Sequence, residues 1–461
     1  TSDLQTIGQN AFLGCTDLTT VTFAENSKLT GIYEQAFLGC QKLESIAIPA
    51  SVTALGDRAF QGCTALTTAT FAEGSQLTVL GNSVFAGCTA LERVHIPASI
   101  KEIRFAAFSG CMALERIRIP VNVTSIGESA LQGCTSLTTI IMEPYMPPTL
   151  GNSTLSDCPK LSTILVSDKA LSTYESACDI GEKGWNAAYK NMLAVGGDCG
   201  AEGHESDVKW AFKPATGTLT ISGTGDMKGY NIINGVAQNL PWENYRTSIE
   251  KVVIESGITE IGSGSFADHT NLTEVTFAKN SKLKKIGGSA FLGCSGLTSI
   301  TIPESVTTIV GWAFLGCTSL TSITIPSSVN SIGAYAFSAC TSLTSITLPS
   351  SVTSIEKEAF SDCAKLTTVT MERSTPPTLG DNIFESCEEL NTIFVPTTAL
   401  SAYQHSDSSK GWDNYKSKLA IGGDCGADGH ESDVTWKLQN GTLTISGKGK
   451  MADYWSVDDI P

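Results

Sequence analysis

Four basic side chains take matching places in two neighbouring segments of the chain, which read LERVHIP and LERIRIP. They are Arg93, His95, Arg116 and Arg118. Basic and apolar residues alternate in both segments, the pattern of a strand with one exposed face. The four side chains should gather on that face, where guanidinium groups bind carboxylates, sulfates or acidic peptides. The alternative is a solvated face on which Glu92 and Glu115 balance the charge.

Glu92 and Glu115 are also candidates for catalysis, because equivalent residues of adjacent strands lie about 4.8 Å apart. Retaining glycosidases hold their two carboxylates about 5–5.5 Å apart. Any two equivalent residues of stacked strands share this spacing, however, and the neighbouring arginines would keep both acids ionised. The sequence contains no phosphate-binding loop, G-x-S-x-G or H-E-x-x-H motif. We therefore predict a non-catalytic protein and keep a glycan-active enzyme as the least favoured hypothesis.

A duplicated segment collects residue types that ligate metals. It reads DCGAEGHESD in its first copy and DCGADGHESD in its second. The candidate ligands are Cys199, His204, Glu205 and Asp207, with Cys425, His430, Glu431 and Asp433 in the second copy. Their spacing matches no strong metal motif, and duplication of a whole module explains why they recur. We predict no metal and no cofactor.

The elements that must position these residues follow a repeat of 23 residues. The run from Leu320 reads LTSITIPSSVNSIGAYAFSACTS, and the next reads LTSITLPSSVTSIEKEAFSDCAK. A fixed period of this length is typical of a solenoid. In each coil, LTSITIP predicts a half-buried strand ended by proline, V-x-x-I a short extended return, and AF-x-x-C an inward cluster at helical spacing. One coil cannot bury its apolar face alone, so the coils must stack with parallel strands.

The exposed strand positions hold Thr or Ser in most coils, which makes the basic residues a local departure. Ile141 and Leu165 take these positions in the next two coils. We interpret both as packing beneath a closing helix rather than as an extension of a binding surface.

Twelve of the fifteen cysteines fall at one fixed position in successive coils, from Cys15 to Cys158 and from Cys294 to Cys387. We interpret them as small buried apolar residues, and His269 takes the same position in one coil. Cys178 and Cys199 lie outside this column, and a disulfide between them stays open.

A larger duplication overlays the coils. MPPTLGNSTLSDC at Met146 returns as TPPTLGDNIFESC at Thr375. Trp185 to Leu193 shows apolar residues at helical spacing, which predicts a helix that closes the first stack. The W…GTLTISG segments predict a small β-rich connector, with a hairpin turn at Asn440-Gly441. The expected domains are a repeat module at 1–195, a connector cap at 196–248, a second module at 249–421 and a partial second cap at 422–461.

Composition limits the classes of partner that the protein can have. The formal net charge of -16 argues against a nucleic-acid partner, and no apolar run is long enough to span a membrane. The chain opens inside a repeat and shows no signal peptide, so we expect a piece of a longer protein whose export signal lies outside it. The oligomeric state stays open.

The motif L-x-x-I-x-I-P-x-x-V-x-x-I-G-x-x-A-F-x-G-C closely resembles the BspA-like leucine-rich repeat family of bacterial surface proteins. The CG…W…TLTISG…PW unit is similar to the segment that precedes such repeats in related proteins. The resemblance implies an extracellular or cell-surface location, adhesion to proteins or other cells, and no catalytic residues. We therefore predict an α/β solenoid scaffold that binds a protein or glycan on its strand face. The alternative is a rigid spacer without a ligand of its own.

Overall fold

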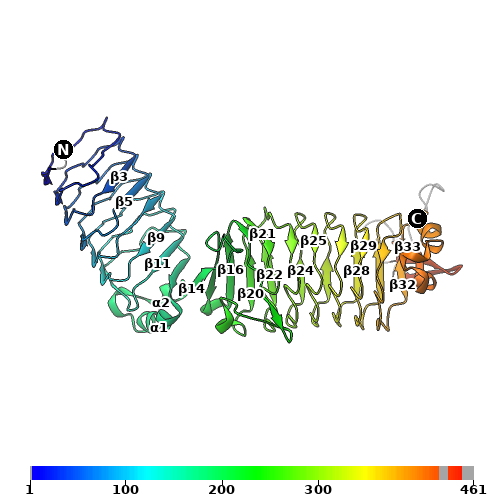
Figure 1. Cartoon of the computed structure of the whole chain (residues 1–461). Helices are drawn as coiled ribbons and strands as arrows, with labels where there is room; N and C mark the ends of the chain where they lie inside the picture. The colour runs from blue at the N-terminus through cyan, green and yellow to red at the C-terminus, as the bar shows by residue number, and fades with distance from the viewer. Residues whose placement is uncertain (1–2, 425–433, 449–461) are drawn as a thin grey trace. The chain divides into compact units, whose positions relative to one another are not determined.

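The computed structural model describes residues 3–424 and 434–448 (Figure 1). The chain divides into two compact units, residues 1–196 with 213–216 and residues 197–212 with 217–461. Among the described residues, no helix combines the length and the apolar character needed to cross a membrane.

The first unit is a stack of coils with two rows of parallel strands. The front row comprises β3 (Ser45–Ile48), β5 (Thr68–Phe71), β7 (Arg93–Val94), β9 (Arg116–Ile119), β11 (Thr139–Met142), β13 (Thr163–Val166) and β14 (Leu193–Asp198). The return row comprises β1 (Thr6–Ile7), β2 (Gly31–Ile32), β4 (Ala54–Leu55), β6 (Val79–Leu80), β8 (Glu102–Ile103), β10 (Ser125–Ile126) and β12 (Thr149–Leu150). Equivalent residues pair in register, as Ile117, Ile140 and Ile164 do. The predicted solenoid fold is confirmed.

The second unit repeats this plan. Its front row comprises β20 (Lys251–Ile254), β22 (Glu274–Phe277), β24 (Ser299–Thr301), β26 (Ser322–Thr324), β28 (Ser345–Leu348), β30 (Thr368–Met371) and β32 (Thr392–Phe394). The return row comprises β21 (Ile258–Ile261), β23 (Lys285–Ile286), β25 (Thr308–Ile309), β27 (Ser331–Ile332), β29 (Ser354–Ile355) and β31 (Thr378–Leu379). Exposed and buried residues alternate along β28, as the sequence pattern predicts.

Two columns of side chains fill each stack. The phenyl rings of consecutive coils stack face to face, and the centroids of Phe291 and Phe314 lie 5.3 Å apart. Ten of the twelve thiols of the cysteine column are buried beside them, as predicted, whereas Cys158 is half-buried and Cys15 is exposed. Eleven of the twelve, all but Cys15, also have a role that the sequence did not indicate, because they donate a hydrogen bond to a carbonyl of the preceding coil. The Sγ of Cys317, for example, lies 3.3 Å from the carbonyl oxygen of Phe291.

The corner between the return and the next strand, predicted as a helical turn, consists of successive turns. The N–H of Cys317 donates to the carbonyl of Phe314 within the coil. The N–H groups of Trp312, Phe314 and Gly316 instead donate to carbonyls of the next coil, at 2.8–2.9 Å. Because alternate N–H groups bond outward, the segment does not continue as a regular helix. The corner thereby becomes a third ladder that joins the coils.

The closing segment of the first unit differs from the prediction. Its main helix is α1 (Leu171–Ile180), and α2 (Ala187–Lys190) is a single turn. The predicted helix from Trp185 to Leu193 is wrong, because Leu193 begins β14, which pairs in parallel with β13. The indole N–H of Trp185 instead donates to the carbonyl of Pro148 at 2.9 Å.

The second closing segment uses the same contacts around α3 (Leu400–Gln404). Trp412 Nε1 donates to the carbonyl of Pro377 at 2.8 Å, and the Tyr403 hydroxyl donates to the carbonyl of Arg373. An aromatic pair thus anchors each closing segment to the proline turn before it.

The connectors are β-rich, as predicted. The first contains β15 (Val208–Lys213), β16 (Thr218–Gly223), β17 (Gly225–Asp226), β18 (Ile232–Ile233) and β19 (Val236–Ala237). The second contains β33 (Leu419–Asp424), β34 (Val434–Gln439) and β35 (Thr442–Gly447). β34 and β35 pair in antiparallel fashion across Asn440 and Gly441, which both have positive φ, so the predicted hairpin turn is confirmed. Cys178 and Cys199 are free thiols.

Burial of the cysteine column predicts unequal thiol reactivity. Burial raises the pKa of Cys340 to about 12, whereas Cys15 at the open end is exposed. Because the thiolate is the reactive form, native Cys340 should react with iodoacetamide at pH 8 at least about 100-fold more slowly than Cys15. Peptide mapping by mass spectrometry measures both rates, and urea should equalise them. Equal rates in the native protein would contradict the buried column.

His269 predicts a pH-dependent stability. It lies fully buried in the cysteine column, and burial lowers its pKa to about 4. Between pH 6.5 and pH 4 the unfolded chain takes up a proton that the folded chain refuses, so stability falls as the pH falls. His269→Cys should remove about 2 kcal/mol of the stability lost between pH 7.5 and pH 4.5.

Urea midpoints of both proteins at the two pH values measure this difference. His95→Gln, a change at an exposed histidine, is the control and should keep the wild-type pH dependence. An unchanged pH dependence in His269→Cys would show that other groups are responsible.

Candidate binding surface on the strand face

The structure places all four predicted basic residues on the exposed face of the first unit. Arg93 lies on β7, Arg116 and Arg118 lie on β9, and His95 directly follows β7. All four side chains are exposed. The basic side chains form two rows across the strands. These rows continue in register onto the neighbouring strands, since Arg93 pairs with Thr68 on β5.

The charges on this face are balanced differently from the prediction. Arg118 forms an ion pair with Glu143, which follows β11 in the next coil. Neither Glu92 nor Glu115 forms an ion pair within 4.0 Å among the described residues. Arg93 and Arg116 likewise have no ion-pair partner in the described part of the chain. Two guanidinium groups are therefore left for a ligand.

The front sheet is interrupted where these arginines lie. The sheet formed by β3, β5 and β7 ends at β7, and the next sheet begins at β9. β7 itself spans only two residues, and its Val94 is half-buried, whereas the equivalent Ile117 is buried. Like charges at equivalent places on neighbouring strands repel one another. The front row of the second unit is also divided, between β22 and β24 and between β26 and β28, so the break at β7 is not specific to the arginines.

Ile141 and Leu165 continue the row of Arg118 onto the next two strands, in register. Both are half-buried. Their packing beneath a closing helix stays a prediction.

The structure does not bring the four candidate metal ligands of the first connector together at one site. His204 Nδ1 lies 2.9 Å from a carboxylate oxygen of Asp207 at the surface. Cys199 is buried, and burial raises its pKa to about 12. Among the described residues, no group of three or more His, Cys, Asp or Glu side chains is placed to hold a metal. The second set, Cys425, His430, Glu431 and Asp433, lies outside the described residues.

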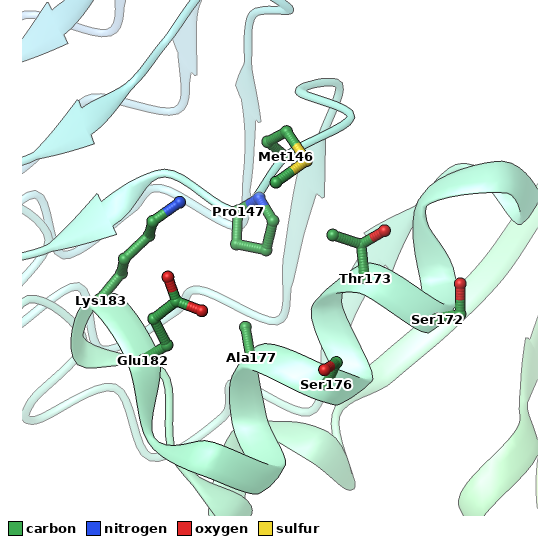
Figure 2. A pocket seen from close by; sticks show the side chains of 8 residues that line it. All are labelled: Met146, Pro147, Ser172, Thr173, Ser176, Ala177, Glu182 and Lys183. Carbon is green, nitrogen blue, oxygen red and sulfur yellow. The ribbon is translucent and has the colours of Figure 1, made fainter.

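Sequence reasoning missed a pocket of about 290 Å³ in the first closing segment (Figure 2). Its lining consists of Met146, Pro147, Ser172, Thr173, Ser176, Ala177, Glu182 and Lys183. The sequence signal is the longer first closing segment, since Trp185 lies 14 residues after Leu171 whereas Trp412 lies 12 residues after Leu400. In the structure, α1 accordingly spans ten residues and α3 five. In the second unit, Lys410 donates to the carbonyl of Pro376 at 3.3 Å. The pocket is at the small end for ligand sites and could hold a small polar group.

The sequence pattern of the BspA type leucine-rich repeat region matches four stretches of the chain, residues 1–111, 74–178, 243–329 and 312–407. Together they cover more than half of its length. No curated protein matches the chain.

Several solved structures are similar. A leucine-rich repeat protein from Bacteroides ovatus is 27% identical, with 87% of this chain and 89% of that chain covered and a TM-score of 0.34. A leucine-rich cell surface protein from Faecalibacterium prausnitzii is 21% identical, with 81% and 85% covered and a TM-score of 0.27. The pneumococcal vaccine antigen PcpA is 17% identical, with 86% and 68% covered and a TM-score of 0.24.

Repulsion within the cluster predicts that it lowers stability. Arg116→Gln should raise the free energy of unfolding by about 0.2–1 kcal/mol at low salt, because it removes one of two neighbouring like charges. The gain should vanish near 1 M NaCl, where the Debye length is about 3 Å. Urea midpoints at both salt concentrations measure it. Arg118→Gln is the control and should not gain stability, because its charge is paired with Glu143; an equal gain there would refute local repulsion.

Proposed function

Because the chain belongs to the BspA-type leucine-rich repeat family, we propose that it is a non-catalytic scaffold that holds an anionic partner on the strand face of its first unit. The partner is an acidic protein segment or a sulfated glycan. The observation that carries this proposal is the pair of exposed guanidinium groups, Arg93 and Arg116, without an ion-pair partner in the described residues.

The charge of the protein strengthens the argument. In a chain of net charge -16, a basic group has carboxylates in excess to pair with. Arg118 has taken such a partner, whereas Arg93 and Arg116 have not. A bound carboxylate or sulfate would accept parallel hydrogen bonds from a guanidinium group and offset the repulsion between the two arginines. His95 lies beside them and can donate further hydrogen bonds.

The proposed location is the cell surface or the extracellular space, in an adhesive role. Support for it comes from the family resemblance. A stack joined by three hydrogen-bonded ladders also suits a rigid spacer, and that alternative requires no ligand at all. The two functions differ in one respect that can be measured, which is the dependence of binding on the arginine cluster.

Immobilised heparin and immobilised poly-L-glutamate test the cluster directly. The double variant Arg93→Glu with Arg116→Glu should bind both polymers at least about tenfold more weakly than the wild type at physiological salt, because charge-assisted contacts become repulsive. Binding of the wild type should weaken as NaCl rises. Surface plasmon resonance measures these affinities.

Lys101→Glu is the matched control, because it makes the same charge change in the coil of Arg93 but at an exposed position before the return strand β8. It should bind like the wild type. If Lys101→Glu weakens binding as much as Arg116→Glu alone, the polymers are attracted by any basic group of the surface, and the proposed site is refuted. If the wild type binds neither polymer, the spacer is favoured.

A further inference from the structure

The pocket beside Met146 combines apolar surface with polar groups (Figure 2). Pro147 and Ala177 are buried and supply apolar surface. Met146 is 55% exposed and lies across the pocket from α1. The other lining residues carry hydroxyl or charged groups, and they are Ser172, Thr173, Ser176, Glu182 and Lys183. An apolar surface on which a few polar groups converge is the usual composition of a ligand site.

Two opposite charges in the lining have no partner. Glu182 and Lys183 lie in the short 3₁₀ helix η2 (Glu182–Gly184), and both are exposed. Among the described residues, neither forms an ion pair within 4.0 Å, either with the other or with a third residue. Figure 2 shows both side chains on one side of the pocket, facing Pro147 and Ala177. The pocket thus presents one free carboxylate and one free ammonium group.

The second closing segment holds an equivalent lysine that does have a partner. The sequence KGW at Lys183 returns at Lys410. Lys410 donates to the carbonyl of Pro376 at 3.3 Å, and Pro376 is the equivalent of Pro147. Lys183 makes no such bond in the described part of the chain, and its backbone is left-handed, with φ of 55° and ψ of 30°. The ammonium that is bonded within the second segment is therefore free in the first.

Three hydroxyl groups line the side of the pocket that α1 forms. Ser172, Thr173 and Ser176 lie at helical spacing, so they share one face of α1. None of the three hydroxyls has a hydrogen-bond partner among the residues that the structure describes. Each can donate or accept a hydrogen bond. In the second closing segment, Ala402 takes the place of Thr173 and His405 that of Ser176, so this set of hydroxyls belongs to the first segment alone.

Size and charge together restrict the ligand. A volume of about 290 Å³ suits a small molecule rather than a polymer segment. Glu182 and Lys183 are the only charged residues of the lining, and the nearby Asp179 and Lys190 pair with each other at 2.7 Å. Glu182 would repel an anion, and Lys183 would repel a cation. A neutral ligand would displace water from both charged groups without supplying an opposite charge to either.

A zwitterion supplies a partner for each of the two charges. None of the lining residues is aromatic, so a sugar ring would find no flat face on which to stack. The apolar surface of Met146, Pro147 and Ala177 instead suits an aliphatic side chain, whose burial is favourable. A molecule with both charges and an aliphatic side chain is an α-amino acid.

We propose that this pocket binds a free α-amino acid with an aliphatic side chain. Its carboxylate bonds to Lys183, its ammonium group bonds to Glu182, and its side chain lies on Pro147 and Ala177. The site uses no residue of the basic cluster, so this proposal and the proposed function stand or fall separately.

The test uses the full chain with methionine labelled by ¹³C at its methyl group. At millimolar concentration, at least one of L-alanine, L-valine and L-leucine should shift the Met146 methyl resonance, which is assigned by its loss in Met146→Leu. Titration of this shift measures the affinity. N-acetyl-L-leucine and L-leucinamide each lack one charge and should bind at least about fivefold more weakly than L-leucine, because one residue of the pair then loses its partner.

Substitutions in the pocket locate the site. Lys183→Gln and Glu182→Gln should each weaken binding at least about fivefold, whereas Lys410→Gln, at the equivalent lysine of the second unit, should bind like the wild type. Thr173→Trp fills the pocket from α1 and should abolish binding. Its matched control is Ala402→Trp at the equivalent exposed position of α3, which should leave binding unchanged. Unshifted resonances of the other methionines show that each variant keeps the fold.

Four results would each overturn the proposal. The first is that no amino acid shifts the Met146 resonance. The second is that an analogue lacking one charge binds as tightly as L-leucine, because the pocket would then recognise a single charge. The third is that methyl glucoside or O-phosphoethanolamine binds more tightly than every amino acid, which would assign the pocket to a sugar or to another zwitterion. The fourth is that binding survives Thr173→Trp.

Discussion

The structure depends on one constraint, which is that every coil must lie in register on the next. The front strands, the return strands and the corners each send N–H groups to carbonyls of the neighbouring coil. Register superposes equivalent residues, and so it produces the continuous columns of phenyl rings and thiols inside the stack. A residue out of register would leave both its apolar contacts and its hydrogen bonds unmet, as in other solenoids.

Stacking in register also determines how this fold can make binding sites. A coil by itself presents only one or two side chains at each exposed position, and its neighbours repeat that choice about 5 Å away. A site arises where two adjacent coils depart from the repeat together. The arginines of β7 and β9 are one such departure, and the stacked Trp312 and Tyr335 are another. The first departure carries a cost, repulsion between like charges, whereas the positive φ of Trp312 and Tyr335 is shared by the equivalent residues of the neighbouring coils.

The closing segments of the two units share two anchoring contacts and differ elsewhere. In both units a tyrosine hydroxyl and an indole N–H donate to carbonyls of the segment that ends in two consecutive prolines. These two contacts hold the closing segment against the last coils. Outside them the segments vary in helix length, and the first forms the pocket beside Met146. A larger sequence duplication therefore did not produce two equivalent surfaces.

Much of the fold follows from the sequence by itself, because the repeat sets which side chains alternate and the turn residues set where strands end. The solenoid, the buried cysteines, the exposed basic residues and the hairpin at Asn440-Gly441 were all predictable in this way. Tertiary structure alone decided three other features. They are the ion pair of Arg118 with Glu143, the place of Trp185 against the proline turn instead of on a helix, and the stack of Trp312 on Tyr335. Each joins residues from different coils or segments, and local periodicity holds no information on how side chains far apart in the chain meet.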